Sequence, residues 1–251
     1  TISSFIQNDM AEFVSKGTQT VAIAGVLAWS ARHATEFTHT YNVNTGDIDV
    51  KGSTGAELYM GGVVGASQST NTSGFGQKCT HMRNEGNISI NLSSCGKWFN
   101  FGGTVGVSYN VQDELYNEGD ITVRGASGSQ THIGGVSGYH GYAVEDTAGI
   151  TNINNSGKVD VAFTSATGDI FVGGAMAYIL SGVETATNSG EVICGGVGGK
   201  NSYIAGTLSV GAYTAAKLGI SGLTNSGKVT ANYSTHTGGT YVAGTVGYAK
   251  S

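Results

Sequence analysis

The sequence contains no proline at all among its 251 residues. Proline cannot donate a backbone hydrogen bond, so without it every residue is able to join the ladder of a sheet. Charge is also scarce: charged residues make up 12% of the chain, and the formal net charge is −5. Because no basic cluster is present to collect phosphates, we expect no binding to nucleic acid.

The chain also lacks long hydrophobic runs and cysteine pairs. Its longest apolar stretch, residues 21–29, is about half of the ~20 residues that span a bilayer as a helix, so we expect no membrane-spanning segment. Cys79, Cys95 and Cys194 form an odd set, which excludes a complete disulfide framework, although Cys79 and Cys95 could pair in an oxidising compartment. Neither cysteines nor histidines have metal-ligand spacing, so we expect no metal and no cofactor.

Glycine is abundant, at 42 residues, and it marks a repeat. In a first phrase, glycine follows asparagine by two positions and precedes isoleucine or valine by two. The six copies are Asn44 and Gly46, Asn84 and Gly86, Asn117 and Gly119, Asn155 and Gly157, Asn188 and Gly190, and Asn225 and Gly227. This pattern predicts a turn followed by a short strand whose alternate residues face inward. Stacked asparagines can hydrogen-bond to one another, and glycine supplies a tight or left-handed turn.

A second phrase, with its own central glycine, lies 16 or 17 residues after each first one. The central glycines are Gly62, Gly103, Gly135, Gly174, Gly206 and Gly244, and an early extra copy surrounds Gly25. Mostly apolar residues two positions before and after each glycine predict a second strand that runs through it. The chain thus holds six full repeats preceded by a half repeat, and the length variation falls in the connection after the second phrase, as surface loops allow.

Two short strands cannot bury their own apolar face, whereas stacked repeats bury a continuous core. We therefore predict an all-β fold, a parallel β-helix or β-solenoid of about six and a half repeats, over residues 18–251. The asparagine column favours one coil per repeat, because alternate rungs would interrupt the ladder. A β-propeller and a β-prism are the alternatives, although propeller blades usually need four strands.

The two ends of the chain differ. Apolar residues at helical spacing predict an amphipathic helix over residues 1–17 that caps the open end of the stack. The last strand phrase has no comparable cap. Either the chain was cut there, or that end meets another molecule.

One outward column of the repeat is rich in aromatic residues. Three positions before the second-phrase glycine lie Ala22, Tyr59, Asn100, His132, Phe171, Tyr203 and Tyr241. By parity they face outward, and the aromatic members with His132 are the candidate surface for a ligand or partner, such as sugar rings or another protein. The alternative is that they only shield the sheet. Small residues beside this column predict a flat, mildly apolar face.

Carboxylates show no catalytic pattern. Asp47 and Asp120 share one outward position of the repeat, which holds Lys158 in the next coil. Mixed signs in one column predict a solvated face with cross-coil pairs. We therefore assign no catalytic residues and expect no enzyme, with a polysaccharide lyase or hydrolase as the open alternative.

The two phrases, N-x-G-x-[IV]-x-V and G-G-[VT]-x-G, resemble the glycine-rich repeats, including GLUG-type repeats, of surface and secreted proteins of Bacteroidota-type bacteria. The resemblance covers residues 20–248. It implies an extracellular or cell-surface β-solenoid with an adhesive or structural role, and it carries over no catalytic residue. The expected function is thus a rigid, self-assembling rod that contacts its own copies, other surface proteins or glycans. A glycan-binding or glycan-cleaving β-helix is the alternative.

Overall fold

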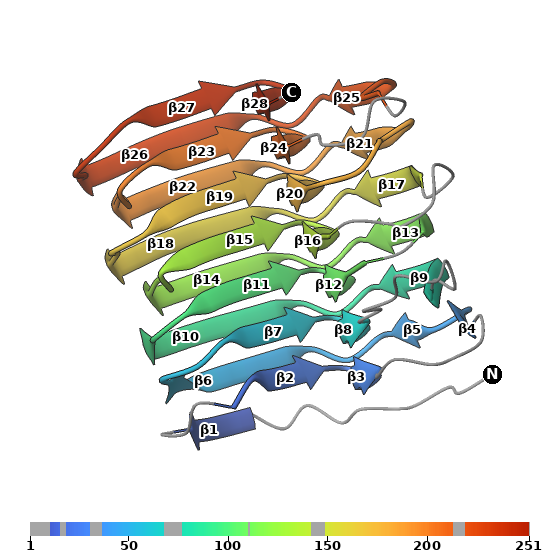
Figure 1. Cartoon of the computed structure of the whole chain (residues 1–251), viewed down its shortest axis with the longest axis horizontal. Coiled ribbons are helices and arrows are strands. Elements are labelled where there is room, and N and C mark those ends of the chain that lie inside the picture. Colours follow the sequence, from blue (N-terminus) through green and yellow to red (C-terminus); the bar gives the residue numbers. More distant parts are fainter. Residues whose placement is uncertain are drawn as a thin grey trace.

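The computed structural model describes residues 11–15, 19–30, 37–67, 77–109, 111–141, 149–212 and 219–250. Strands β1 to β28 are the regular elements of these ranges, which contain no helix. The strands form four parallel sheets, and the chain passes through sheets A, B, C and D in turn before it re-enters sheet A one level higher (Figure 1). The protein is therefore a parallel β-solenoid, and the propeller and β-prism alternatives are wrong.

Each repeat is one coil with one strand per sheet, except that β4 and β5 of the first coil both pair with β9 in sheet D. Sheet A comprises β1 (Ala11–Ser15), β6 (Ile48–Thr54), β10 (Ile88–Cys95), β14 (Ile121–Ala126), β18 (Val159–Ser165), β22 (Val192–Val197) and β26 (Val229–Thr235). Sheet B comprises β2 (Val21–Ala24), β7 (Leu58–Gly61), β11 (Trp98–Gly102), β15 (Gln130–Gly134), β19 (Asp169–Gly173), β23 (Ser202–Ala205) and β27 (Thr240–Ala243). Sheet C comprises β3 (Leu27–Ser30), β8 (Val64–Ser67), β12 (Val105–Ser108), β16 (Ser137–His140), β20 (Met176–Ile179), β24 (Leu208–Ala212) and β28 (Val246–Lys250). Sheet D comprises β4 (Phe37–Thr40), β5 (Val43–Asn44), β9 (Gln77–Asn84), β13 (Gln112–Asn117), β17 (Ile150–Asn155), β21 (Ala186–Asn188) and β25 (Leu223–Asn225).

The prediction of an N-terminal helix is wrong for residues 11–15, the part of that segment that the structure describes. Residues 11–15 form β1, which pairs in parallel with β6 from Ala11 opposite Val50 to Ser15 opposite Thr54. The edge of β6 presents backbone donors and acceptors, and a strand satisfies these groups whereas a helix does not. The remaining residues of the predicted helix lie outside the described ranges.

Two interior cores run through the stack, so each coil has two lobes. One core lies between sheets A and B and contains, for example, Val50 and Met60. The other lies between sheets C and D and contains Val64 and Met82. Figure 1 shows the two lobes side by side, joined at the middle of each coil.

The asparagine column lies at the junction of the lobes. Each Nδ2 donates to Oδ1 of the asparagine in the next coil at 2.7 or 2.8 Å, without a gap from Asn44 to Asn225. The same Nδ2 donates to the carbonyl oxygen of its own turn glycine, as from Asn155 to Gly157 at 2.7 Å. The predicted ladder and the prediction of one coil per repeat are therefore confirmed.

The second-phrase glycines lie against this ladder. A Cβ on Gly174 would stand 2.4 Å from Cγ of Asn188 and 1.9 Å from the carbonyl oxygen of Gly206 in the next coil. Neither distance admits a methyl group. The same two contacts occur at Gly62, Gly103, Gly135 and Gly206. The nearly constant offset between the two phrases is thus the number of residues that form the A/B lobe. This segment of the chain leaves the junction after the asparagine and returns to it at the glycine.

The turn glycines of the first phrase allow the backbones of neighbouring coils to approach each other closely. They do not form left-handed turns. The backbone at Gly157 does not have a positive φ. A Cβ there would lie 2.0 Å from the carbonyl oxygen of Gly119 in the preceding coil. Glycine is required because successive backbones stack directly on each other at this turn.

The second phrase is two strands, not one. The chain bends at the central glycine, so that β7 ends at Gly61 and β8 begins at Val64. Because of this bend, Val63 and Val136 point into the C/D core, where both are fully buried. The predicted flat outer face is therefore wrong.

The two strands predicted for each repeat do not include the strand of sheet D. The inward-facing residues of this strand lie three positions apart, whereas the prediction relied on a spacing of two. Cys79 and Met82 both enter the C/D core, and so do Ile150 and Ile153. Between the members of such pairs stands a residue with left-handed backbone, for example His81 with φ 54°. Such a bulge reverses the alternation of a strand, so the period of two is lost.

The three cysteines are free thiols. Cys79 lies in the C/D core, whereas Cys95 packs against the A/B core, so the two do not pair. Burial raises the pKa of Cys79 to about 11 and that of Cys194 to about 12. Both thiols are protonated at neutral pH and act as small core side chains.

We predict that Asn155→Ala lowers the free energy of unfolding by about 3 kcal/mol, because it removes three buried hydrogen bonds. Urea unfolding followed by circular dichroism measures the change. The matched control is Asn154→Ala, at the neighbouring half-buried position, which should cost no more than about 1 kcal/mol. Equal losses in the two variants would contradict a special role for the ladder.

Candidate functional site

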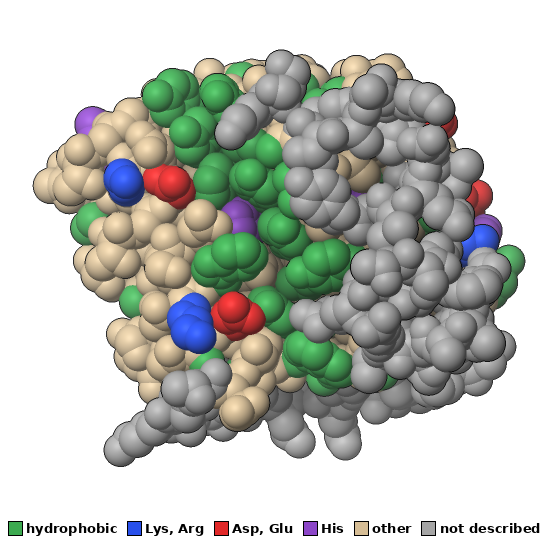
Figure 2. All heavy atoms as spheres, in the orientation of Figure 1, with side chains coloured by type: hydrophobic (Ala, Val, Ile, Leu, Met, Phe, Trp, Pro, Cys, Tyr) green, Lys and Arg blue, Asp and Glu red, His purple; other side chains and the backbone are tan. Residues whose placement is uncertain are grey.

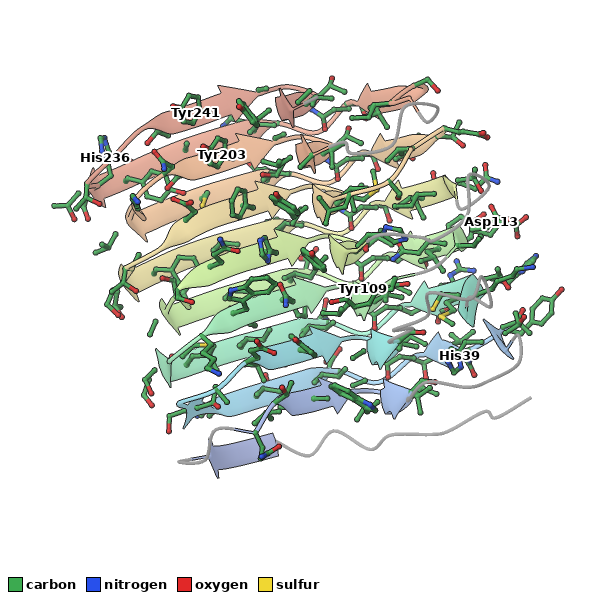
Figure 3. The ribbon with its side chains drawn as sticks, in the orientation of Figure 1. His39, Tyr109, Asp113, Tyr203, His236 and Tyr241 are labelled. Atoms are coloured by element: carbon green, nitrogen blue, oxygen red, sulfur yellow. The ribbon has the colours of Figure 1, made fainter. Side chains whose placement is uncertain are left out.

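The aromatic column lies on the outer face of sheet B, and its residues are in register from coil to coil. The rings of His132, Phe171, Tyr203 and Tyr241 form a continuous stack, with successive centroids 4.8 to 5.1 Å apart. This spacing is close to the distance between neighbouring strands, so the stack follows directly from the register. Figure 3 shows Tyr203 and Tyr241 one above the other on β23 and β27.

A second set of rings lies on the adjoining outer face of sheet C. Its members, each four positions after a second-phrase glycine, are Trp29, Tyr139, Tyr178 and Tyr248. Tyr178 meets Phe171 edge-on at 5.2 Å, and Tyr248 lies 5.6 Å from Tyr203. The regular spacing of these residues is visible in the sequence. However, Val64 faces inward two positions after its glycine, and in a regular strand the residue two positions further on would also face inward. The sequence alone would therefore place these rings inside the core.

The rings of the two sheets together make what we call the aromatic band: Tyr59, His132, Phe171, Tyr203 and Tyr241 with Trp29, Tyr139, Tyr178 and Tyr248. Figure 2 shows hydrophobic side chains gathered along the middle of this face. The outer surfaces of sheets B and C turn toward each other here, because their side chains are in direct contact.

Exposure changes along the band. Tyr59 and Phe171 are each 6% exposed and His132 is 1% exposed, whereas Tyr241 is 45% exposed. Neighbouring rings such as Phe171 and Tyr203 also cover each other, with planes only 6° apart. Three of the five residues predicted as a contact surface are thus buried, and the exposed rings of the band lie on the first coil, at Trp29, and on the last, at Tyr241 and Tyr248.

The buried part of the band contains one polar pair, His132 and Asn100. Nδ1 of His132 donates to Oδ1 of Asn100 at 2.5 Å, so Nε2 is left as an acceptor. Nε2 has no hydrogen-bond partner. Burial lowers the pKa of His132 to about 3, and no charged group contributes to this shift. The imidazole is therefore neutral at physiological pH and packs as part of the ring stack.

The carboxylates make contacts between coils. Oδ1 of Asp47 accepts a hydrogen bond from the backbone N–H of Asn87 at 2.7 Å, and Oδ1 of Asp120 accepts one from the backbone N–H of Lys158 at 2.8 Å. Asp160 forms an ion pair with Arg124 at 2.9 Å. Within the predicted column, Lys228 forms an ion pair with Glu191 of the preceding coil at 3.9 Å, so a cross-coil pair of opposite charge is present there.

Two features are absent from the described ranges. No group of three or more His, Cys, Asp or Glu side chains in these ranges is arranged to hold a metal ion. The same part of the chain contains no helix long and apolar enough to cross a membrane.

No protein-family model, curated protein or solved structure matches this chain.

We predict that His132 makes the protein less stable in acid. The unfolded histidine binds a proton below its ordinary pKa near 6.5, whereas the folded one, with a pKa of about 3, does not. Stability is therefore lost as pH falls from about 6.5 toward 3, by about 1.4 kcal/mol per pH unit. The variant His132→Asn carries the residue found at this position one coil earlier. It should remove this pH dependence of the free energy of unfolding, measured by urea unfolding between pH 4 and 7. His236→Asn, at an exposed site, is the control and should keep it. An unchanged slope in His132→Asn would contradict the assignment.

Proposed function

We propose that the protein is a structural or adhesive repeat module of the cell surface or the extracellular space. It is a rigid rod of about six and a half repeats that acts by contact and not by catalysis. The observation that carries this proposal is the uninterrupted parallel pairing between coils in all four sheets. The resemblance to glycine-rich surface repeats supports the location.

The pairing makes the coils mechanically continuous. Adjacent coils share four parallel strand pairs over most of the stack, and the buried asparagine ladder adds a further bond at each level. In a repeat protein of this kind each unit contacts only its neighbours, so the coils add along a single stacking axis. Such a rod suits a spacer or a support for contacts with its own copies or with other surface proteins.

Adhesion tests this proposal. Beads coated with the chain should be retained under flow on surfaces coated with mucin, or with the chain itself, at least about tenfold better than albumin-coated beads, because many weak contacts act together. Beads carrying urea-unfolded chain are the control for folded structure. Retention at the albumin level on both surfaces would contradict an adhesive role.

Glycan binding is the second candidate, and one observation favours it. Tyr241 and Tyr248 are 45% and 43% exposed, and both lie beside Tyr203, at 4.8 and 5.6 Å between ring centroids. A sugar ring stacks on the free face of an aromatic ring. Within the described structure, the face of Tyr241 turned away from Tyr203 has no ring stacked on it.

We predict that Tyr241→Ala weakens any glycan captured by the wild-type chain on a glycan array by about tenfold, the value of one good ring contact. The control is Tyr41→Ala, which removes a more accessible tyrosine, 62% exposed, from the first coil. A wild-type chain that captures no glycan would exclude this function.

A further inference from the structure

One tyrosine of the aromatic band is hydrogen-bonded to a carboxylate. The hydroxyl of Tyr59, on β7, donates to Oε2 of Glu57 at 2.5 Å, the length of a short bond between a hydroxyl and a charged oxygen. The same Oε2 accepts a longer bond from Oγ1 of Thr20 at 3.4 Å. Tyr59 is 6% exposed and Glu57 is half-buried. The phenol is thus closed off from solvent, and its proton points at a base.

This environment keeps Tyr59 protonated as long as the ring holds all its electrons. Burial, then the hydrogen bond to Glu57 and the charge of that carboxylate, raise the pKa of Tyr59 above its ordinary value. Loss of one electron reverses the preference, because an oxidised phenol is a strong acid. Its proton then needs an acceptor within hydrogen-bond distance, and Glu57 is in that position.

Other rings that lose an electron readily lie beside Tyr59. Tyr109 and Tyr139 pack against its cluster, and their own centroids are 6.1 Å apart. Tyr139 lies 5.9 Å from Trp98, and 5.8 Å from Tyr178 with the two planes 11° apart. Tyrosine and tryptophan are the aromatic side chains that give up one electron most easily, and rings in contact exchange an electron without moving. These five residues therefore form a connected redox-active array.

The array is reached from solvent on inner coils of the stack. Trp98, Tyr139 and Tyr178 are half-buried, so a small oxidant contacts them before it contacts Tyr59. Their strands β11, β16 and β20 each have a paired strand on both sides. Strand β11 pairs directly with β7, so Trp98 and Tyr59 lie on neighbouring strands.

We propose that Tyr59 and Glu57 form a one-electron redox site, at which an oxidising radical that attacks these rings is converted into a long-lived tyrosyl radical. The substrate class is a diffusible one-electron oxidant, such as an oxygen-centred radical. This activity goes beyond the adhesive function and does not depend on it.

The step balances in electrons and protons. The oxidant takes one electron from Trp98 and is reduced, and Tyr59 replaces that electron through Tyr139 and Tyr109. The O–H bond of Tyr59 breaks, and its proton forms a new O–H bond with Oε2 of Glu57. The products are the reduced oxidant, a neutral phenoxyl radical and a neutral carboxylic acid.

Two features retain the radical at Tyr59. The carboxylic acid of Glu57 donates its hydrogen bond back to the phenoxyl oxygen, so the proton stays available for the reverse reaction. The ring is 6% exposed, and Trp29 stacks on it at 6.0 Å with the planes 15° apart. A covered ring does not couple with a radical on another molecule.

The test is oxidation of the folded 251-residue chain by a ruthenium(III) polypyridyl complex generated with a laser flash. Tyrosyl radicals are followed by absorption and, after freezing, by electron paramagnetic resonance. The wild type should give one dominant, long-lived tyrosyl signal, and Tyr59→Phe should lose it. The matched control is Tyr203→Phe, in the same column and half-buried, whose hydroxyl has no carboxylate bonded to it within the described structure. It should keep the signal.

Glu57→Gln isolates the proton acceptor. Glutamine keeps an oxygen that accepts the hydrogen bond of Tyr59, but it does not take the proton. The tyrosyl radical should therefore form about a hundredfold more slowly, the lower end of what a positioned base contributes. Glu191→Gln makes the same change of charge on sheet A, where Glu191 pairs with Lys228, and it should react like the wild type. Circular dichroism should be the same for all variants.

Three outcomes would overturn the proposal. A tyrosyl signal that persists in Tyr59→Phe would place the radical on another ring. Equal rates in Glu57→Gln and the wild type would show that the carboxylate does not take the proton. A wild type without any tyrosyl signal, under a flash that oxidises a tyrosine peptide, would exclude the redox site. The bead assay decides the adhesive function separately, because retention does not require oxidation.

Discussion

The buried asparagine ladder, packed against the second-phrase glycines, is the contact on which the solenoid depends. Each amide is satisfied only when another asparagine lies one coil away and in register. A slipped coil would leave buried polar groups without partners, which costs far more than exchanging one apolar neighbour for another. Valine and isoleucine fill the cores, but the ladder selects one register among those that the cores would tolerate.

The glycine side of this contact determines the shape of the coil. Because Gly174 has no side chain, Asn188 reaches the point where the chain bends between sheets B and C. The bend divides each coil into two lobes and turns the outer faces of sheets B and C toward each other. Aromatic side chains fill the resulting corner, and the register stacks them. The aromatic band is therefore a consequence of the same junction.

This origin explains where the protein is able to make contacts. In a periodic stack, each coil covers the exposed surface of its neighbour, so Phe171 and His132 are buried although they lie outside both cores. Only the terminal coils have a face without a neighbour among the described residues. Among the described residues, the exposed large hydrophobic side chains accordingly lie on the first and last coils, for example Trp29 and Val242, and none lies on the coils between.

The sequence by itself determined the repeat, one coil per repeat, the asparagine column and the outward position of Tyr203, because these depend on local alternation and on the stacking of like residues. Only the tertiary structure decided the bend at Gly174, the bulged strands of sheet D, the strand formed by residues 11–15 and the burial of His132. Each of these results from contacts between distant parts of the chain. The bend requires an asparagine from the next coil, and the bulge hides the inward spacing of Cys79 and Met82. Burial depends on the coils above and below, which no single repeat reveals.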